Sequence, residues 1–127
     1  NKDKVYPNSP SGMPGVQTLM PVMLNHVNEG KLTLNQLMKL MCENPIKIFG
    51  IQNKGFIKEG YDADFTIVDM KKTIEIKNEN IESKCGWTPF NGDKFKGTPT
   101  HTIIAGNIKM QDGKILGDPD GTPLKFS

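Results

Sequence analysis

Residues 54–69 read Lys-Gly-Phe-Ile-Lys-Glu-Gly-Tyr-Asp-Ala-Asp-Phe-Thr-Ile-Val-Asp, and this stretch decides the fold of the chain. Gly55 and Gly60 mark sharp bends, because glycine adopts positive φ without steric cost. The aromatic and β-branched residues near its end are typical of a buried strand. The stretch therefore predicts a hairpin at the edge of a small sheet, with strands at residues 55–57 and 65–70.

Short strands also fill the rest of the chain after residue 50, where the apolar pattern alternates. We expect them at residues 73–76, 100–105, 107–111 and 114–116. Ala105-Gly106-Asn107 and Gln111-Asp112-Gly113-Lys114 predict the hairpin turns, and the Asp112-Gly113 pair favours positive φ. Lys71–Lys72 predicts a solvated turn between strands.

Two stretches of this half lack a regular pattern. Residues 78–99 are expected to be irregular, with Trp87 and Phe90 as anchors. Residues 117–127, rich in proline and glycine, are expected to be loosely held.

The chain before residue 50 has helical periodicity instead. The first helix is expected to begin at Gly15, to be kinked or started by Pro21, and to end at Gly30. Thr33 is a predicted N-cap for a second helix, and Asn44-Pro45 predicts a new cap before a third. The apolar stripes expected to be buried are Val16, Leu19, Met20, Met23, Leu24 and Val27 on the first helix, and Leu34, Leu37, Met38, Leu40 and Met41 on the second.

Helices followed by strands predict an α+β fold, with a division near residue 50. The chain has 127 residues and a net charge of +2, with scattered lysines, so nucleic-acid binding is not indicated. Two distant cysteines, Cys42 and Cys85, favour a reducing, cytoplasmic compartment without a disulfide framework. No apolar run approaches about 18 residues, so no membrane span is expected. The sequence starts without Met and resembles an internal part of a longer protein.

The titratable residues do not form a complete catalytic set. His26 and His101 have no partner at metal-ligand spacing and are interpreted as surface or structural residues. Asp62 is expected to accept backbone N–H groups in its turn rather than to form a catalytic pair with Asp64. The calcium-loop pattern at residues 118–121 is weak, because the closing glutamate is missing.

The loop before the first helix is the remaining candidate. Gly12-Met13-Pro14-Gly15 could present backbone N–H groups to an anion at the N-terminus of the helix. From the residues alone, however, a plain turn that starts a helix is the better interpretation.

Three segments together are similar to the dihydroorotase family of cyclic amidohydrolases. The first is Tyr-Pro-Asn-Ser-Pro-Ser-Gly-Met-Pro-Gly-Val-Gln-Thr-Leu at residues 6–19, which resembles the segment after the last catalytic strand. The second is Asn-Pro-Ile-Lys-Ile-Phe-Gly at residues 44–50 with residues 54–69, which resembles the exit from the catalytic barrel. The third is Lys-Cys-Gly-Trp-Thr-Pro-Phe-Asn-Gly at residues 84–92, with Gly97 and residues 102–106.

The resemblance implies a TIM-like barrel joined to a small β-sandwich. Residues 1–50 would be the last loop and helices of the barrel, and residues 51–127 the C-terminal share of the sandwich. It also implies zinc in the full-length parent, held by ligands upstream of this chain together with the catalytic aspartate, so that the chain holds no catalytic or metal residue of its own. Ser11 and Gly12 match positions that contact the substrate.

These implications predict a C-terminal fragment of a zinc-dependent dihydroorotase that is inactive by itself. Its partners would be a small-molecule substrate, dihydroorotate or N-carbamoyl-L-aspartate, and the remainder of its own enzyme; the resemblance leaves a homo-oligomer open. Three alternatives remain: a fragment of an allantoinase or dihydropyrimidinase, a metal-free amidohydrolase-like scaffold, or an independent β-sandwich binding module.

Overall fold

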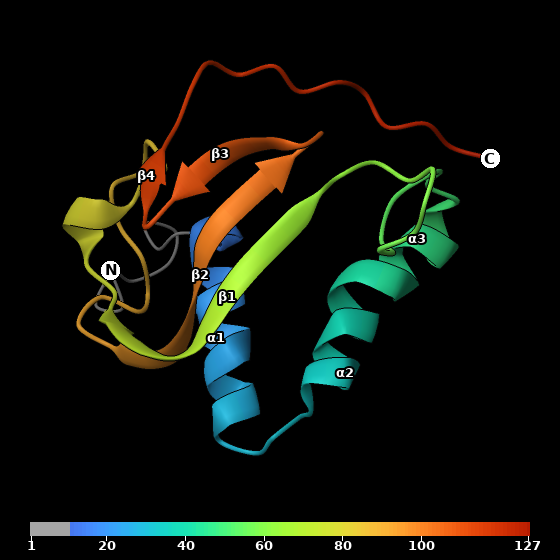
Figure 1. Cartoon of the computed structure of the whole chain (residues 1–127). Coiled ribbons are helices and arrows are strands. Elements are labelled where there is room, and N and C mark those ends of the chain that lie inside the picture. The colour runs from blue at the N-terminus through green and yellow to red at the C-terminus, as the bar shows by residue number, and fades with distance from the viewer. Residues whose placement is uncertain (1–10) are drawn as a thin grey trace.

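The computed structural model describes residues 11–127 and has the predicted order of helices followed by a sheet (Figure 1). The helical elements are α1 (Val16–Asn28), α2 (Leu34–Met38), the π-helix η1 (Lys39–Glu43) and α3 (Asn44–Phe49). The sheet contains β1 (Phe65–Glu75), β2 (Lys94–Ile104), β3 (Asn107–Gln111) and β4 (Lys114–Ile115), and the 3-10 helix η2 (Asn78–Asn80) lies between β1 and β2. The predicted α+β class is confirmed.

The first helix ends as expected. The Gly30 N–H bonds the Val27 carbonyl at 3.0 Å, and the Lys31 N–H bonds the His26 carbonyl at 3.0 Å. Gly30 has a φ of 73°, a backbone angle that residues other than glycine adopt only with strain. Pro21 lies inside α1 rather than at its start and is buried.

A capping box starts the second helix, as Thr33 predicted. The Thr33 hydroxyl accepts the Gln36 N–H at 3.2 Å, and the Gln36 side chain accepts the Thr33 N–H at 2.7 Å. The new cap predicted at Asn44 is wrong, because Glu43 and Asn44 both have helical φ and ψ. Residues 34–49 instead form one continuous helical path, in which a π-helical turn precedes Pro45.

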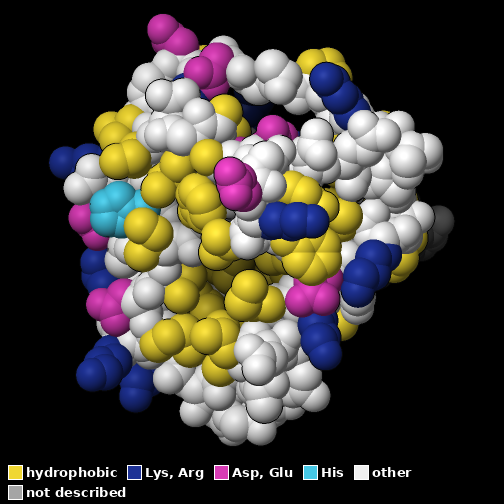
Figure 2. All heavy atoms as spheres, turned by 45° about the vertical axis from the view of Figure 1, so that its right-hand side comes forward, with side chains coloured by type: hydrophobic (Ala, Val, Ile, Leu, Met, Phe, Trp, Pro, Cys, Tyr) yellow, Lys and Arg dark blue, Asp and Glu magenta, His cyan; other side chains and the backbone are white. Residues whose placement is uncertain are grey.

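The predicted apolar stripes are only partly buried. Leu24 on α1 and Leu37 on α2 are 1% and 3% exposed, whereas Val16 at the start of α1 is 97% exposed. Leu19, Leu34, Met38 and Leu40 are also exposed, so their predicted burial is wrong for this chain. Figure 2 shows one face on which apolar side chains gather around a hollow.

The segment that decided the predicted fold contains one strand, not two. Residues 55–57 form no strand, because Asn53, Gly55 and Gly60 all have positive φ and turn the chain repeatedly. The predicted hairpin is therefore wrong in its first strand. The second strand begins at Phe65, as expected.

The two strands predicted around Lys71–Lys72 are a single strand, β1. Its register against β2 is irregular between Asp69 and Thr73, and the Asp69 side chain accepts the N–H groups of Lys71 and Lys72 at 2.8 and 3.1 Å. The lysines therefore occupy a solvent-exposed bulge rather than a turn.

Four antiparallel strands form the sheet in the order β1-β2-β3-β4. The predicted turns are confirmed, with positive φ at Ala105-Gly106 and at Asp112-Gly113. Helix α1 packs against β2, where Gly97 lies so close to Leu24 that an added Cβ would be 2.7 Å from the Leu24 Cβ.

The irregular stretch predicted at residues 78–99 is shorter than expected, because residues 94–99 belong to β2. Its two predicted anchors are confirmed. Trp87 and Phe90 are half-buried, and the Phe90 ring meets the Phe95 ring edge-on at 5.6 Å. The end of the chain is exposed throughout residues 117–127, as expected of a loosely held segment, but it has two points of attachment. Residues 117–127 return to the helices, and Phe126 forms a β-bridge with Ile51.

Candidate functional site

The loop before α1 is the site that the sequence predicted. Ser11 and Gly12 lie in an exposed bend, and a Cβ added to Gly12 would meet no atom within 4 Å. Among the described residues, nothing fills the space beside Gly12. The residues that precede Ser11 lie outside the described part of the chain.

Helix α1 starts without a side-chain cap. Gly15 occupies the N-cap position and has no side chain to accept a hydrogen bond, and the first turn contains no acidic residue. The Gly15 carbonyl accepts the Leu19 N–H at 2.8 Å and the Thr18 N–H at 3.2 Å. The first N–H groups of such a helix favour negative charge, which is compatible with the predicted anion contact.

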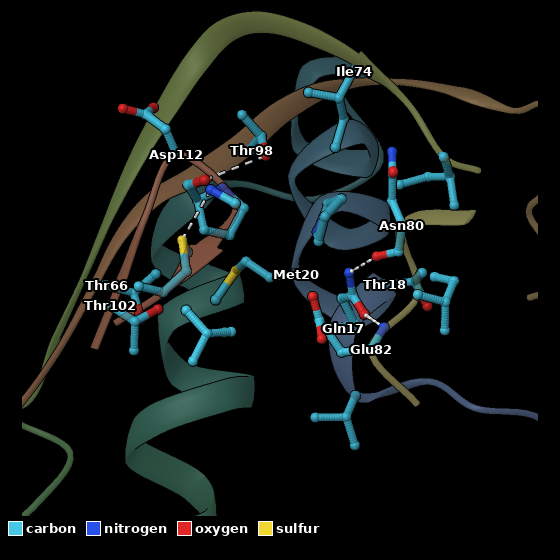
Figure 3. A pocket seen from close by; sticks show the side chains of 18 of the residues that line it. Gln17, Thr18, Met20, Thr66, Ile74, Asn80, Glu82, Thr98, Thr102 and Asp112 are labelled. Carbon is cyan, nitrogen blue, oxygen red and sulfur yellow. Dashed lines mark hydrogen bonds between the residues drawn. The ribbon is translucent and has the colours of Figure 1, made fainter. Parts of the chain in front are cut away.

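A groove of about 700 Å³ lies beside the first two turns of α1 (Figure 3). Its lining is mainly apolar and comes from α1, from the sheet and from the segment after β1. Met20 comes from α1, Ile74 and Thr98 come from the sheet, and Ile81 comes from the segment after β1. Lys72 and Asp112 lie at the rim of the groove and form a 3.7 Å ion pair. Exposed apolar grooves of this kind mark places where another molecule or segment packs.

Gln17 fixes one wall of this groove. Its side-chain amide donates to the Asn80 carbonyl at 2.7 Å and accepts the Glu82 N–H at 2.9 Å, as Figure 3 shows. One side chain of α1 thus holds the irregular segment after η2 in place.

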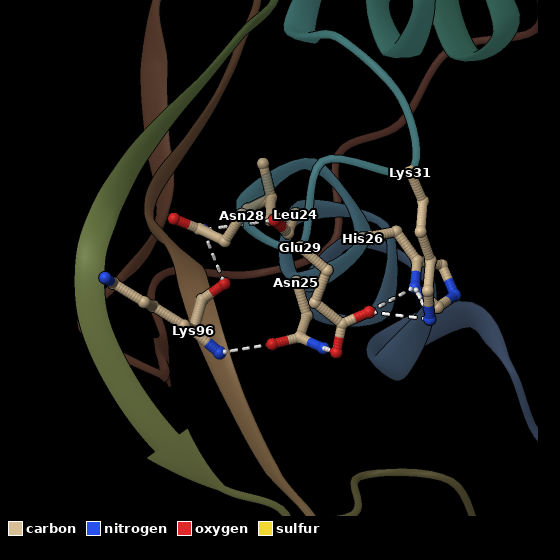
Figure 4. A network of polar contacts seen from close by, with 7 residues as sticks. All are labelled: Leu24, Asn25, His26, Asn28, Glu29, Lys31 and Lys96. Atoms are coloured by element: carbon tan, nitrogen blue, oxygen red, sulfur yellow. Dashed lines mark hydrogen bonds and ion pairs between the residues drawn. The ribbon is translucent and has the colours of Figure 1, made fainter.

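Two asparagines join α1 to the sheet (Figure 4). The Asn25 side chain accepts the Lys96 N–H at 2.9 Å, and the Asn28 side chain donates to the Lys96 carbonyl at 2.8 Å. Strand β3 pairs with β2 only from His101 onward. The asparagines therefore satisfy a backbone edge of β2 that no strand among residues 11–127 covers.

His26 belongs to an exposed charged cluster on the same helix. Its Nδ1 lies 3.2 Å from Glu29, and the Lys31 ammonium lies 2.7 Å from the same carboxylate. These hydrogen bonds, first from Lys31 and then from His26, lower the pKa of Glu29 to about 2. The cluster caps the end of α1 and is not directed into the groove, which supports the surface interpretation of His26.

Lys54 closes the loop between α3 and β1. Its ammonium binds Asp62 at 2.9 Å and also pairs with Asp64, whose carboxylate in addition accepts the Ala105 N–H at 2.8 Å. The hydrogen bond to Asp64 raises the pKa of Lys54, and the same bond lowers the pKa of Asp64. The carboxylate that accepts a backbone N–H is thus Asp64, whereas Asp62 binds Lys54, so the role predicted for Asp62 is wrong.

The remaining candidates are dispersed. His101 is half-buried in β2, with its Nδ1 3.1 Å from the Thr100 hydroxyl. Cys42 and Cys85 are free thiols; burial raises the pKa of Cys42, and a hydrogen bond with Ser83 lowers the pKa of Cys85. Within residues 11–127, no three His, Cys, Asp or Glu side chains come together to hold a metal ion, and no helix is long and apolar enough to cross a membrane.

The family follows from the sequence profile that matches this chain. The profile of the amidohydrolase family matches residues 8–109, which is most of the sequence. The chain belongs to the amidohydrolase family. The predicted resemblance is thereby confirmed at the level of the family.

Among curated relatives of this amidohydrolase chain are two archaeal dihydroorotases. The enzyme of Pyrococcus furiosus is 50% identical over 111 residues, and that of Pyrococcus abyssi is 46% identical over 111 residues. Each alignment covers 87% of this chain and 27% of the relative. The chain thus spans about a quarter of the length of the dihydroorotases that it matches.

A solved amidohydrolase structure has the same arrangement. The L-hydantoinase (dihydropyrimidinase) of Arthrobacter aurescens superimposes with a TM-score of 0.81 at 35% identity, over 84% of this chain and 24% of its own. The helices and the sheet of this amidohydrolase chain are therefore arranged as in one part of a cyclic-amide hydrolase.

Sequence reasoning missed the groove and the residues that frame it. Gln17 and Asn28 carry no motif, because their partners lie 63 and 68 residues away in the chain. The sequence feature that could have indicated them is the set of polar residues Gln17, Asn25 and Asn28 among the apolar residues of α1. A surface helix would normally place such residues in water.

Proposed function

We propose that this chain is the C-terminal part of a longer dihydroorotase. That enzyme would reversibly hydrolyse dihydroorotate to N-carbamoyl-L-aspartate in pyrimidine biosynthesis. The observation that carries the proposal is the 50% identity to a dihydroorotase over 87% of this chain.

In the proposed enzyme, residues 1–50 are the last loop and helices of a TIM-like barrel, and residues 51–127 are the C-terminal share of a β-sandwich. The exposed apolar side chains support this division, because an amphipathic helix is stabilised mainly by packing its apolar face. Val16, Leu40 and Ile48 would gain that packing from the rest of the enzyme.

Zinc belongs to the rest of the proposed enzyme. The described residues of this chain do not provide a set of ligands that fits zinc. A bound zinc ion would supply a water of lowered pKa as the nucleophile. The chain by itself is then inactive, and its own contribution is to position substrate.

Ser11 and Gly12 are the proposed substrate contacts. Their exposed bend leads into the uncapped N-terminus of α1, and βα loops at this end of a barrel form the active sites of such enzymes. The Ser11 hydroxyl would donate to a substrate oxygen, and Gly12 would let the substrate approach the backbone closely.

The first experiment compares substrates of the full-length enzyme that contains this chain. Dihydroorotate, hydantoin, dihydrouracil and allantoin are assayed for ring opening, and zinc is measured in the purified protein. We expect the highest kcat/KM for dihydroorotate and loss of turnover with a chelator. A preference for hydantoin or dihydrouracil would favour the second candidate, a dihydropyrimidinase, which the 35% identity to the Arthrobacter enzyme supports.

The second experiment tests the substrate contact in the same protein. Ser11→Ala should raise KM for dihydroorotate about ten- to hundredfold, because one hydrogen bond to a charged group contributes roughly 1.5–3 kcal/mol. Ser83→Ala is the matched control, since Ser83 is an exposed serine on another loop. Equal KM values for the two variants would remove Ser11 from the site.

A further inference from the structure

Within the described part of the chain, the hydrogen bonds and the ion pair that attach residues 117–127 to the rest of the molecule lie near the two ends of this segment. It leaves the sheet after β4 and runs across to α3, as Figure 1 shows in red. Near the sheet, the Lys109 ammonium binds the Asp120 carboxylate at 2.7 Å and the Asp118 carbonyl at 3.4 Å. Residues 121–124 between the two anchors are exposed.

The far anchor is a short piece of β-ladder on the residues that follow α3. The Gln52 N–H donates to the Lys125 carbonyl at 2.9 Å, and the Ser127 N–H donates to the Gly50 carbonyl at 2.8 Å. Gly50 ends α3 with a φ of 62°, and a Cβ there would lie 2.8 Å from the Ser127 hydroxyl. The helix end and the segment therefore fit closely against each other.

This anchor matters because the outer helices have little other support. Helices α2 and α3 each pack on the π-helical turn between them, and α2 also meets α1, but neither packs on the sheet to a similar degree. We define residues 34–52 as the helical arm. Apart from the chain on either side of it, the arm is held to the sheet side of the molecule by few contacts.

We propose that residues 117–127 act as a strap that fixes the helical arm relative to the sheet. The Lys109–Asp120 ion pair fastens the strap to β3, and the Ile51–Phe126 bridge fastens it to the arm. Release of the far anchor frees the arm while the sheet stays folded. The strap is independent of the proposed activity, since no substrate contact enters the argument.

Hydrogen exchange of the 127-residue chain, read by mass spectrometry, tests the strap. Three variants are compared with the parent: deletion of residues 118–127, Ser127→Pro, which removes the N–H that binds Gly50, and Thr122→Ala as a control on the exposed middle of the strap. We expect exchange at least tenfold faster for residues 44–52 in the first two variants, with exchange of β2 and the Thr122→Ala pattern unchanged.

Three results would overturn the proposal. The first is unchanged exchange of residues 44–52 in both test variants. The second is equal acceleration of β2, which would make the segment part of the global fold rather than a strap. The third is a parent chain whose β2 amides are unprotected, because the strap would then have no sheet to fasten to.

Discussion

Gly97 shows how closely a single residue can control packing. It has a φ of 104° and lies against Leu24 and Asn28 of α1. The position therefore requires both a positive φ and the absence of a Cβ. Any Cβ at this position would enter the space of the one fully buried leucine of α1.

Gly97→Ala should therefore destabilise the chain by about 2–4 kcal/mol, the sum of overpacking and left-handed backbone strain. Gly92→Ala is the matched control, because Gly92 has a φ of 88° but would meet no atom within 4 Å. Urea unfolding followed by circular dichroism measures both variants. Equal losses would mean that backbone strain alone sets the cost.

Asp64 predicts how stability depends on pH. Its pKa is lowered in the folded chain, first by the hydrogen bond from Lys54 and also by the Ala105 N–H. A carboxylate with a depressed folded pKa stabilises the fold above its unfolded pKa of about 3.9, and this stabilisation is lost as pH falls through the folded value.

Asp64→Asn should lower the free energy of unfolding by about 1 kcal/mol at pH 7 and flatten its acid dependence below about pH 4. Asp62→Asn is the control, since Asp62 binds Lys54 but is more exposed, at 51% against 32%. Denaturant titrations at pH 3 and pH 7 compare the two. An acid dependence that survives in Asp64→Asn would assign it to another carboxylate.

At the scale of elements, side chains of α1 form hydrogen bonds to the β2 backbone that a neighbouring strand would otherwise form. Asn28 donates both to the Lys96 carbonyl and to the Leu24 carbonyl, so its amide connects the helix backbone with the sheet backbone. A helix that merely packed on a sheet would leave this strand edge to water.

Asn28→Asp should destabilise the chain by about 1–3 kcal/mol, because the carboxylate cannot donate and would face two carbonyl oxygens. Asn35→Asp, on the exposed side of α2, is the control and should change stability by less than about 0.5 kcal/mol. Thermal unfolding measures both. A neutral Asn28→Asp would show that the Lys96 contact is replaced by water at no cost.

For the whole molecule, the important feature is how much apolar surface it exposes. Val16, Ile48, Phe49 and Ile57 are 97%, 74%, 64% and 83% exposed. Large exposed apolar side chains favour association.

The 127-residue chain should therefore self-associate with increasing concentration and bind a hydrophobic dye. Ile48→Lys should weaken the association, whereas Gln111→Lys, which adds the same charge on β3, should not. Sedimentation velocity between low and high micromolar concentration gives the measurement. A monomer at every concentration that binds no dye would contradict this prediction.

The sequence predicted what depends on neighbours in the chain. The N-cap at Thr33, the end of α1 at Gly30 and both hairpin turns follow from a few adjacent residues, and all are present. The path predicted for residues 50–64 was wrong. In the structure, Lys54 binds Asp62 and Asp64 across a loop with several positive φ angles, and no periodic pattern in the sequence indicates such a loop. The bridge of Phe126 to Ile51 joins positions 75 residues apart, so no local pattern could indicate it.

The candidate site divides in the same way. Glycine and proline before α1 predicted an exposed bend at Ser11 and Gly12, and the bend is there, but their contact with substrate stays a prediction. The groove beside α1 depends on residues from four separate parts of the chain, and only the folded arrangement brings them together.

The π-helical turn at Lys39–Glu43 has a consequence for how this region tolerates change in length. A wider turn accommodates one residue more than an α-helix would over the same rise, so removing one residue there would restore regular spacing. Because the wide turn already absorbs the extra residue, the same deletion would leave the helix beyond it close to its present rotation about the axis. Ile46 would then stay against Gly55, and this region could lose one residue while the chain keeps its path into the sheet.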